Sequence, residues 1–305
     1  MDFRFAFWNC AMSPPGQKEM QSPAHMADAV EVIADLFAKE KIGFLALCEV
    51  NKESFEYLSN TLSELELPLS SQFMPDKTST GSEFDIGYFY DSTQVAIEHS
   101  MAHKGELGTS SVKIAQQLLM VVKEEQPSII NVLVSHWPSQ LLKIADDFRE
   151  ECSKGLRIFI DSLIRENQQV ILMGDYNDEP YSRSLFKNIH ATNDRALVLS
   201  KPDYWLYNPY WKTLSARMPF TVDEQQHDFG TCYSRAANRN NWSTFDQIIF
   251  SGHFLDSGPW YLEESSTGVV LTEKIRAAIM DNKHCFDHIP VIGCIRKREA
   301  THVSV

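Results

Sequence analysis

The stretch QVILMGDYN, residues 169–177, places a short apolar run directly before polar, turn-forming residues. Residues 169–173 are typical of a buried strand, which Gly174 ends. Asp175 and Asn177 follow at once, and a carboxylate in such a place is costly to bury unless it meets a cation or hydrogen-bond donors. Because sites in α/β proteins gather at the mouths of strands, this stretch predicts both a central strand and part of a functional site.

Four other segments combine an apolar run with residues able to bind metal or phosphate. These residues are Asn9 after residues 3–8, Glu49 after residues 43–48, His136 after residues 129–135, and Asp287 and His288 in the segment FDHIP. In a sixth segment, Asp246 lies at the start of a predicted strand over residues 245–250. Each residue alone is explained equally well as a cap, turn or loop residue, so the prediction of a site depends on all six segments together.

The rest of the chain predicts further helices and strands. Additional strands are expected over residues 84–90, 116–122 and 290–295, and helices over residues 22–41, from Asn51 onward, and over residues 140–167. Residues 188–242 are expected to be irregular. No repeat or Gly/Ser/Pro-rich linker divides the sequence, so we predict a single domain over residues 1–305, of mixed α/β class with helices covering sheet faces.

The composition is that of an ordinary globular protein, with 43% hydrophobic residues, 23% charged residues and a formal net charge of −13. A field of this sign repels polyanions, although a divalent cation and a few local cations can reverse it within one cleft. None of the six cysteines falls in a C-x-x-C pair, which favours reduced core thiols. The N-terminus is unlike a signal peptide and no apolar stretch approaches a membrane span. We therefore expect a cytoplasmic protein with no membrane contact and no obligate protein partner.

Several of the residues at the strand mouths are oxygen donors. Glu49 and Asp287 offer carboxylates, and Asn9 and Asn177 offer amide oxygens. Hard divalent cations such as Mg²⁺ prefer such ligands. A cation of this kind neutralises phosphate oxygens and steadies the leaving oxygen in phosphoester hydrolysis.

The remaining residues are groups that titrate. Phosphoester hydrolysis needs a base to take a proton from water and an acid or cation to assist the leaving alcohol, and His136, His288 and Asp175 are the candidates. A histidine is held in one tautomer when a carboxylate accepts its other N–H, and Asp246 is a candidate partner for His288. The residue types therefore predict metal-assisted hydrolysis of a phosphate ester.

In their order along the chain, these six segments resemble the endonuclease/exonuclease/phosphatase superfamily, which includes deoxyribonuclease-like nucleases, sphingomyelinases and inositol-polyphosphate phosphatases. The resemblance extends over residues 3–295, nearly the whole chain. It implies one catalytic domain with the deoxyribonuclease I-like fold. That fold is a four-layer sandwich of two mixed β-sheets packed face to face, with helices on both outer faces. It also implies dependence on Mg²⁺ or Mn²⁺.

The resemblance further implies roles for the site residues. Glu49 would be the principal metal ligand, Asp287 and Asn9 would help to hold metal or the scissile phosphate, and Asn177 would fix the phosphate. Asp175 would orient or deprotonate the attacking water. The two histidines would act on the phosphate or the leaving group: His288, paired with Asp246, as a phosphate contact or base, and His136 as a donor to the pentacovalent phosphate or as the acid.

Two positions depart from, or leave open, the family pattern. Abasic-site endonucleases carry an acid two residues after the first-strand Asn, where this chain has Ala11, so metal binding would depend more on Glu49. Some nucleases give the residue corresponding to His136 a carboxylate partner from an earlier strand. Glu83 and Asp85 are both candidates for that partner.

Two further residues, His284 and Arg149, are candidates for a site. His284 and His288 are four residues apart, but Pro290 argues against the helix that would present both to a zinc ion, so we interpret them as unrelated. Arg149, beside the apolar stripe of the long predicted helix, is interpreted as solvated rather than directed at the site.

An aromatic segment bears on the choice of substrate. Residues 204–211 read YWLYNPYW, and more aromatic and arginine residues follow, namely Arg217, Tyr233, Arg235, Arg239 and Trp242. Aromatic faces interleaved with arginine stack unpaired bases and pair with phosphates, so Trp205, Trp211 and Arg235 are candidate substrate-binding residues. The alternative is a long loop that packs its own aromatic side chains.

The favoured hypothesis is a metal-dependent nuclease, endo- or exonucleolytic, with a nucleic acid or nucleotide substrate. The second is a phosphatase or phosphodiesterase acting on a small phosphorylated metabolite or a phospholipid headgroup. The third is an inactive relative that serves as a binding module, which is disfavoured because none of the core residues is missing.

Overall fold

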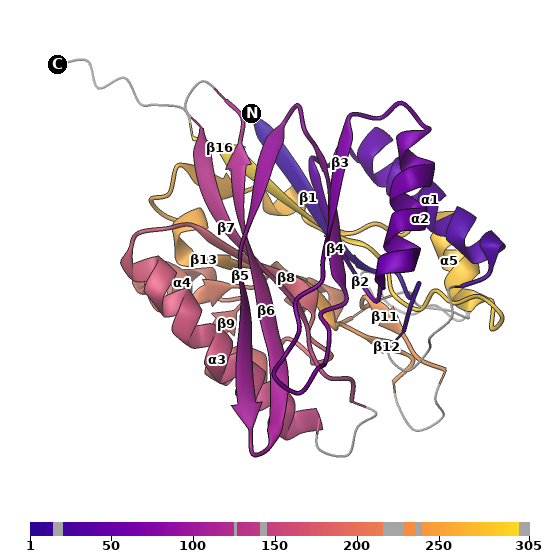
Figure 1. Ribbon diagram of the computed structural model, residues 1–305. Helices are drawn as coiled ribbons and strands as arrows, with labels where there is room; N and C mark the ends of the chain where they lie inside the picture. Colours follow the sequence, from indigo (N-terminus) through magenta and orange to yellow (C-terminus); the bar gives the residue numbers. More distant parts are fainter. Residues whose placement is uncertain (15–20, 125–126, 141–144, 216–228, 236–239, 299–305) are drawn as a thin grey trace, which may run out of the picture.

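Two mixed β-sheets pack face to face in the computed structural model, and helices cover the outer face of each sheet (Figure 1). The structure describes residues 1–14, 21–124, 127–140, 145–215, 229–235 and 240–298. The predicted four-layer α/β sandwich is confirmed.

The first sheet brings together the two ends of the sequence. In spatial order its strands are β14 (Trp260–Leu262), β16 (Val291–Lys297), β1 (Asp2–Asn9), β2 (Phe44–Cys48), β4 (Ile86–Asp91) and β3 (Leu69–Met74), with β15 (Gly268–Val269) also paired to β16. Strands β1 and β2 are parallel, and the other pairs are antiparallel. The carboxyl ends of β1 and β2 therefore lie at the same edge.

The second sheet is built from the middle of the chain. In spatial order its strands are β5 (Val95–Leu107), β6 (Ser110–Val122), β7 (Ser128–His136), β8 (Val170–Asp175), β13 (Asp246–Ser251), β10 (Leu206–Tyr207) and β9 (Ala191–Thr192). Strands β7 and β8 are parallel, and β13 runs antiparallel to β8, so the start of β13 lies beside the end of β8. A separate pair, β11 (Cys232–Tyr233) and β12 (Trp242–Ser243), lies near α5 (Figure 1).

The helices fall into two groups. Helices α1 (Pro23–Ala38), α2 (Lys52–Ser63) and α5 (Glu273–Met280) pack on the first sheet, and α3 (Ala145–Arg165) packs on the second. The remaining helical segments are α4 (Arg195–Ser200), a π-helical turn η1 (Arg183–Asn188), and the 3₁₀ turns η2 (Pro209–Thr213), η3 (Gly252–Phe254) and η4 (Glu264–Ser266). Ser22 and Asn51 cap α1 and α2 as their sequence context predicts.

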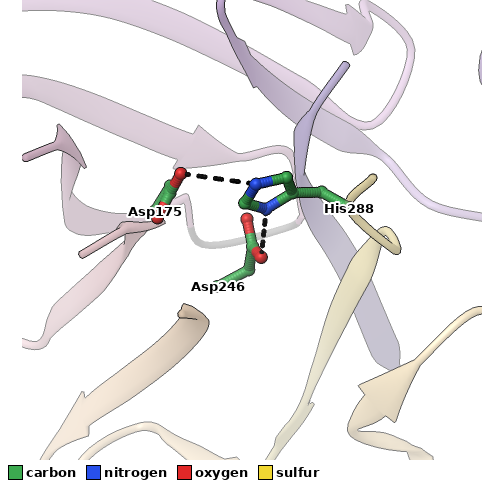
Figure 2. Close-up of side chains that lie close together, drawn as sticks. All are labelled: Asp175, Asp246 and His288. Atoms are coloured by element: carbon green, nitrogen blue, oxygen red, sulfur yellow. Dashed lines mark hydrogen bonds and ion pairs between the residues drawn. The ribbon is translucent and has the colours of Figure 1, made fainter. Parts of the chain in front are cut away.

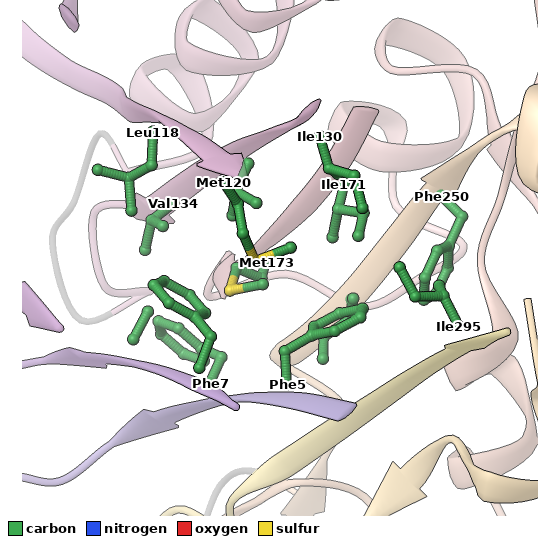
Figure 3. Close-up of a cluster of buried hydrophobic side chains, with 14 of the residues drawn as sticks. Phe5, Phe7, Leu118, Met120, Ile130, Val134, Ile171, Met173, Phe250 and Ile295 are labelled. Carbon is green, nitrogen blue, oxygen red and sulfur yellow. The ribbon is translucent and has the colours of Figure 1, made fainter. Parts of the chain in front are cut away.

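Strand β1 shows how the layers are filled. Phe5 and Phe7 point into the core between the sheets, where they meet side chains of the second sheet such as Met173 (Figure 3). Ala6 and Trp8 point to the other face and pack beneath the helices. Successive residues of a strand alternate between faces, and here both faces are buried, which explains the continuous apolar run.

Several elements were not predicted. Residues 188–242 were expected to be irregular, but they contain the strands β9, β10 and β11 and the helix α4. These elements could not be predicted because strands of two residues carry no detectable periodicity and α4 has only six residues. Strand β5 was missed since two shifts of its register against β6 interrupt the alternation of its side chains. The long helix is described from Ala145, and residues 141–144 lie outside the described part.

All six cysteines are free thiols, as predicted. Five of them are buried and Cys285 is half-buried. Among the helices that the structure describes, none is both long and apolar enough to cross a bilayer.

Gly174 occupies a position that a larger residue does not fit. It pairs with Ser135 across the parallel strands β7 and β8, and a Cβ atom added to it would lie 2.1 Å from the Ser135 carbonyl oxygen. We expect Gly174→Ala to lower the free energy of unfolding by about 2 kcal/mol or more, because the backbone of Ser135 cannot move away from the added methyl group without disturbing the packed core. Urea denaturation would measure this loss.

Gly268→Ala is the matched control, since a Cβ atom there meets no atom nearer than Lys212 Cε at 3.9 Å. Equal losses in the two variants would contradict the steric account of Gly174.

Candidate active site

The six predicted segments converge on one cavity of about 860 Å³. Its lining includes Glu49, His136, Asp175, Asn177, Asp287 and His288. Asn9 lies directly behind this surface, where its Nδ2 donates to Asp175 Oδ2 at 3.0 Å. This hydrogen bond joins the end of β1 in the first sheet to the end of β8 in the second, so the site is built where the two sheets meet.

His288 is held by a carboxylate on each side (Figure 2). Its Nδ1 lies 2.7 Å from Asp246 Oδ2, and its Nε2 lies 3.9 Å from Asp175 Oδ2. The backbone carbonyl of His288 also accepts a hydrogen bond from Trp8 Nε1 at 3.1 Å. The predicted pairing of His288 with Asp246 is therefore present, and it leaves Nε2 directed toward Asp175.

His136 has a second arrangement of the same kind. Its Nδ1 lies 2.7 Å from Asp85 Oδ2, while Lys113 Nζ donates to Asp85 Oδ1 at 2.7 Å. The geometry thus selects Asp85 over Glu83, which instead forms an ion pair with Lys77. His136 Nε2 lies 3.9 Å from Asp175 Oδ2, so both histidines present Nε2 to the same carboxylate.

Charges in the site shift the pKa values of both histidines. Burial alone would lower the pKa of His136, but the carboxylates of Asp85, Asp175 and Glu49 outweigh it and raise that pKa to about 9. Asp246 likewise raises the pKa of His288 well above its ordinary value, against the effect of burial. Both shifts favour the protonated, positively charged imidazole.

The backbone turns sharply at three of the strand ends. Ala11, Glu49 and Asn177 have φ values of 52°, 56° and 50°, in the left-handed region that side chains rarely favour. Two of these turns are supported by side chains, because Asn9 Oδ1 accepts from Ala11 N and Asn177 Nδ2 donates to the Trp137 carbonyl. Such conformations cost free energy and persist where the surrounding structure requires them.

The donor set fits a hard divalent cation. The carboxylates of Glu49, Asp175 and Asp287 face the cavity, and burial raises the pKa values of Glu49 and Asp287. Three carboxylates gathered in a partly buried place are costly without a compensating charge. A cation that binds oxygen ligands would remove that cost.

One group of possible metal ligands is especially compact. Asp175, Asp246 and His288 each place a ligand atom within 4.8 Å of the others. However, Asp246 Oδ2 and His288 Nδ1 already bond to each other at 2.7 Å. Of the two carboxylates in this group, Asp175 is the one among the described lining residues of the cavity.

The predicted substrate-binding residues do not lie together. Arg235 lines the cavity, whereas Trp205 and Trp211 are not among its described lining residues. Both tryptophans pack around Phe186, and Trp205 precedes β10 at the end of the second sheet remote from Asp246. The aromatic side chains of this segment thus pack mainly on other parts of the chain, such as Phe186 and His190. Arg217 and Arg239 lie outside the described residues.

The prediction that Arg149 is solvated was wrong. The residue is 2% exposed, its Nη1 donates to the Pro138 carbonyl at 3.0 Å, and its Nε lies 3.5 Å from Asp178 Oδ2. The partners come from the loops that follow β7 and β8, which a pattern along one helix does not reveal. Arg149 therefore links the loops that directly follow His136 and Asp175.

Two residues of the cavity were not anticipated from the sequence as parts of the site. Lys113 lies within β6 in an alternating pattern that gives no functional signal, and Tyr233 was noted only as one aromatic residue among several. His284, in contrast, lies 3.2 Å from Asp28 and packs on His25, so it and His288 have different partners, consistent with the interpretation that they are unrelated.

Comparisons with known proteins agree with this fold. Solved structures with the same fold include the human Nocturnin catalytic domain with bound sulfate anion, which is 16% identical, with 97% of this chain and 95% of that chain covered and a TM-score of 0.60. ANGEL2, a 2′,3′-cyclic phosphatase, is 13% identical (97% and 95% covered, TM-score 0.59). D. rerio TDP2 complexed with single strand DNA product is 14% identical (97% and 99% covered, TM-score 0.59). At these identities the likeness establishes the fold alone.

None of the curated protein sequences matches this chain. The profile of the Endonuclease/Exonuclease/phosphatase family, in contrast, matches residues 13–276, most of the sequence. The chain therefore belongs to the Endonuclease/Exonuclease/phosphatase family and is a phosphoesterase of that superfamily.

Proposed function

We propose that this protein is a Mg²⁺- or Mn²⁺-dependent nuclease that hydrolyses a phosphodiester by attack of water. The observation that carries the proposal is the convergence of Glu49, Asp175, His136 and His288 on one cavity, with both Nε2 atoms 3.9 Å from Asp175 Oδ2. A phosphate group placed there would meet the Nε2 atoms of two histidines, with the carboxylate of Asp175 3.9 Å from both. Those are the groups that phosphodiester hydrolysis requires.

Glu49 is the proposed principal ligand of the cation, with Asp287 and the Asn9 amide beside it. When bound, the cation would supply Lewis-acid stabilisation of charge on the phosphate and leaving oxygens. Ala11 follows Asn9 without an acidic side chain, so Glu49 carries more of the binding than in relatives with an acid there.

Asp175 is the proposed base that orients the attacking water. Its Oδ1 accepts from the Asn177 backbone N–H at 2.9 Å and its Oδ2 accepts from Asn9, so both oxygens are fixed in place. When protonated, as the direction of their pKa shifts favours, His288 and His136 would donate from Nε2 to the phosphate oxygens as negative charge builds up. His136 is the proposed acid for the leaving oxygen, and Asn177, which lines the cavity, is proposed to fix the phosphate.

A nucleic acid is the favoured substrate because Tyr233 and Arg235 line the same cavity as Glu49. An aromatic ring beside an arginine suits a base and its phosphate. A small phosphorylated molecule is the second candidate. Four carboxylates line the cavity, whereas Lys113 and Arg235 are the Lys and Arg residues among its described lining. A small substrate needs fewer cationic contacts than a nucleic acid with several phosphates.

Incubation of the purified protein with single-stranded DNA, RNA and phosphorylated metabolites, each with Mg²⁺, with Mn²⁺ or with EDTA, tests the proposal. We expect cleavage of a nucleic acid that EDTA abolishes. We also expect Glu49→Gln to raise the metal concentration that gives half-maximal rate by at least ~10-fold, as loss of a ligand-supporting group does in other metal sites.

Glu83→Gln is the matched control, because Glu83 lines the same cavity but is paired with Lys77. Turnover of metabolites alone would rule out the nuclease. Absence of any hydrolysis, together with unchanged metal binding in Glu49→Gln by calorimetry, would instead indicate a binding module.

A further inference from the structure

One wall of the cavity is a continuous run of four residues, Cys232, Tyr233, Ser234 and Arg235, that begins in β11. This wall is attached directly to the site. The Tyr233 backbone N–H donates to the Asp287 carbonyl at 2.7 Å, and Cys232 forms a β-bridge with His288. A group of the substrate that extends from the scissile phosphate along this wall would therefore meet Tyr233 and Arg235.

The Tyr233 ring is held from two sides. The Trp242 ring, which is buried beneath the helices, has its centroid 5.0 Å from that of Tyr233. The Arg235 guanidinium lies over the Tyr233 ring at 5.6 Å from its centroid. Because both neighbours fix the ring, little side-chain entropy remains to be lost when a ligand packs on it.

Arg235 is anchored by neutral acceptors. Its Nη2 donates to the carbonyl oxygens of Ile279 and Asp281, at the C-terminal end of α5. Carbonyl oxygens orient a guanidinium but leave its positive charge in place. Lys113, the other basic residue among the described lining residues, is paired with Asp85. Among the described lining residues, Arg235 is thus the Lys or Arg side chain that is oriented by neutral acceptors, and its charge also partly offsets the burial that raises the pKa of Asp287.

We propose that Tyr233 and Arg235 form the binding site for a nucleotide next to the scissile phosphodiester, with its phosphate bound by Arg235 and its base packed against the Tyr233 ring. The proposal rests on the proposed nuclease function and narrows it. The substrate carries a second phosphate and an aromatic base beside the bond that is cut. Arginine pairs with phosphate through two parallel N–H donors, and aromatic rings stack on any base, so the site selects for nucleotides without selecting a sequence.

Short substrates with one scissile bond test the phosphate contact. Thymidine dinucleotides that carry a 5′-phosphate, a 3′-phosphate or neither are compared by kcat/KM in Mg²⁺ or Mn²⁺. We expect the wild-type protein to prefer one of the phosphorylated forms, and Arg235→Gln to reduce that preference about tenfold, which is a typical effect for one charge-assisted contact. Arg235→Lys keeps the charge and should restore part of the preference.

A matching substrate with an abasic sugar in place of one base tests the Tyr233 contact. Tyr233→Leu should remove the preference for the base, roughly five- to tenfold for one stacked base, and keep the preference for the phosphate. The control is Arg195→Gln, since Arg195 lies over the Tyr207 ring at 5.4 Å in a similar pair that is not part of the described cavity lining. This variant should retain both preferences.

Arg235 also connects β11 to α5, so a purely structural role is the competing explanation. In that case Arg235→Gln would lower the melting temperature and slow all the substrates equally, which would overturn the proposal. A wild-type protein with no preference for phosphate or base would overturn it as well. Failure to cleave single-stranded DNA and RNA as well as these substrates, with either metal, would contradict the proposed function itself and would be recognised before the variants are compared.

Discussion

Asp175→Asn is expected to lower kcat/KM for a phosphodiester by at least about a hundredfold, which corresponds to a loss of ~3 kcal/mol in transition-state stabilisation. The substitution keeps the size of the side chain but removes the charge and the base. It also disturbs the hydrogen bonds, since both oxygens of Asp175 accept from fixed donors, Asn9 Nδ2 and the Asn177 N–H. The amide that replaces it must turn its own NH₂ group toward one of these donors. Steady-state kinetics with a nucleic acid substrate would measure the loss.

Thermal unfolding separates a loss of chemistry from a loss of structure in this variant. Asp203→Asn is the control, because the Asp203 side chain is 80% exposed and is not part of the described cavity lining. Near-normal turnover in a folded Asp175→Asn protein would remove Asp175 from the mechanism.

His288→Ala should cost at least as much, ~3 kcal/mol or more, because it removes a cationic donor from the phosphate site and leaves Asp246 buried without its partner. Asp246 is 0% exposed, and its Oδ2 bonds to His288 Nδ1. Asp246→Asn should have a smaller but substantial effect, since it releases the imidazole from its fixed orientation. Kinetics of both single variants and of the double variant measure these losses.

In the double variant, the two losses should fall well short of their sum, since Asp246 acts through His288. His253→Ala is a close control. His253 is also buried and lies 3.1 Å from a carboxylate, Asp203, yet it is not part of the described cavity lining. A His253 variant as impaired as the His288 variant would mean that the loss reflects stability rather than catalysis.

The parts of the fold that could be predicted are those in which one strand or helix carries its own signal. Strand β8 has an apolar run long enough to be buried on both faces, and Gly174-Asp175 marks its end. Helices α1 and α2 begin at Ser22 and Asn51, whose side chains cap them as local chemistry requires. Strand β5 could not be predicted in this way, because its bulges break the alternation and its pairing with β6 decides its position.

The same distinction separates the site residues that could be predicted from those that could not. Residues that follow a strand directly, such as Glu49 and His136, could be recognised from their position in the chain. The pairing of Asp246 with His288 could also be anticipated, but other residues whose role depends on a partner from another element could not be assigned. Asp85 differs from Glu83 through its contact with His136. Arg149 is buried where Asp178 and the Pro138 carbonyl, as well as Asp146 of its own helix, contact its guanidinium. Trp205 and Arg235 looked equivalent in the sequence, but the folded chain places only Arg235 on the cavity.

The hydrogen bond from Asn9 to Asp175 has a consequence for the whole molecule. The donor and the acceptor belong to different sheets, and the layer between those sheets is filled largely by apolar side chains such as Phe7 and Met173. A displacement of one sheet past the other by a single ångström would misalign the proposed base while most of the secondary structure stayed intact. Catalytic turnover should therefore detect a shift between the two sheets more sensitively than spectroscopic measurements of secondary structure do.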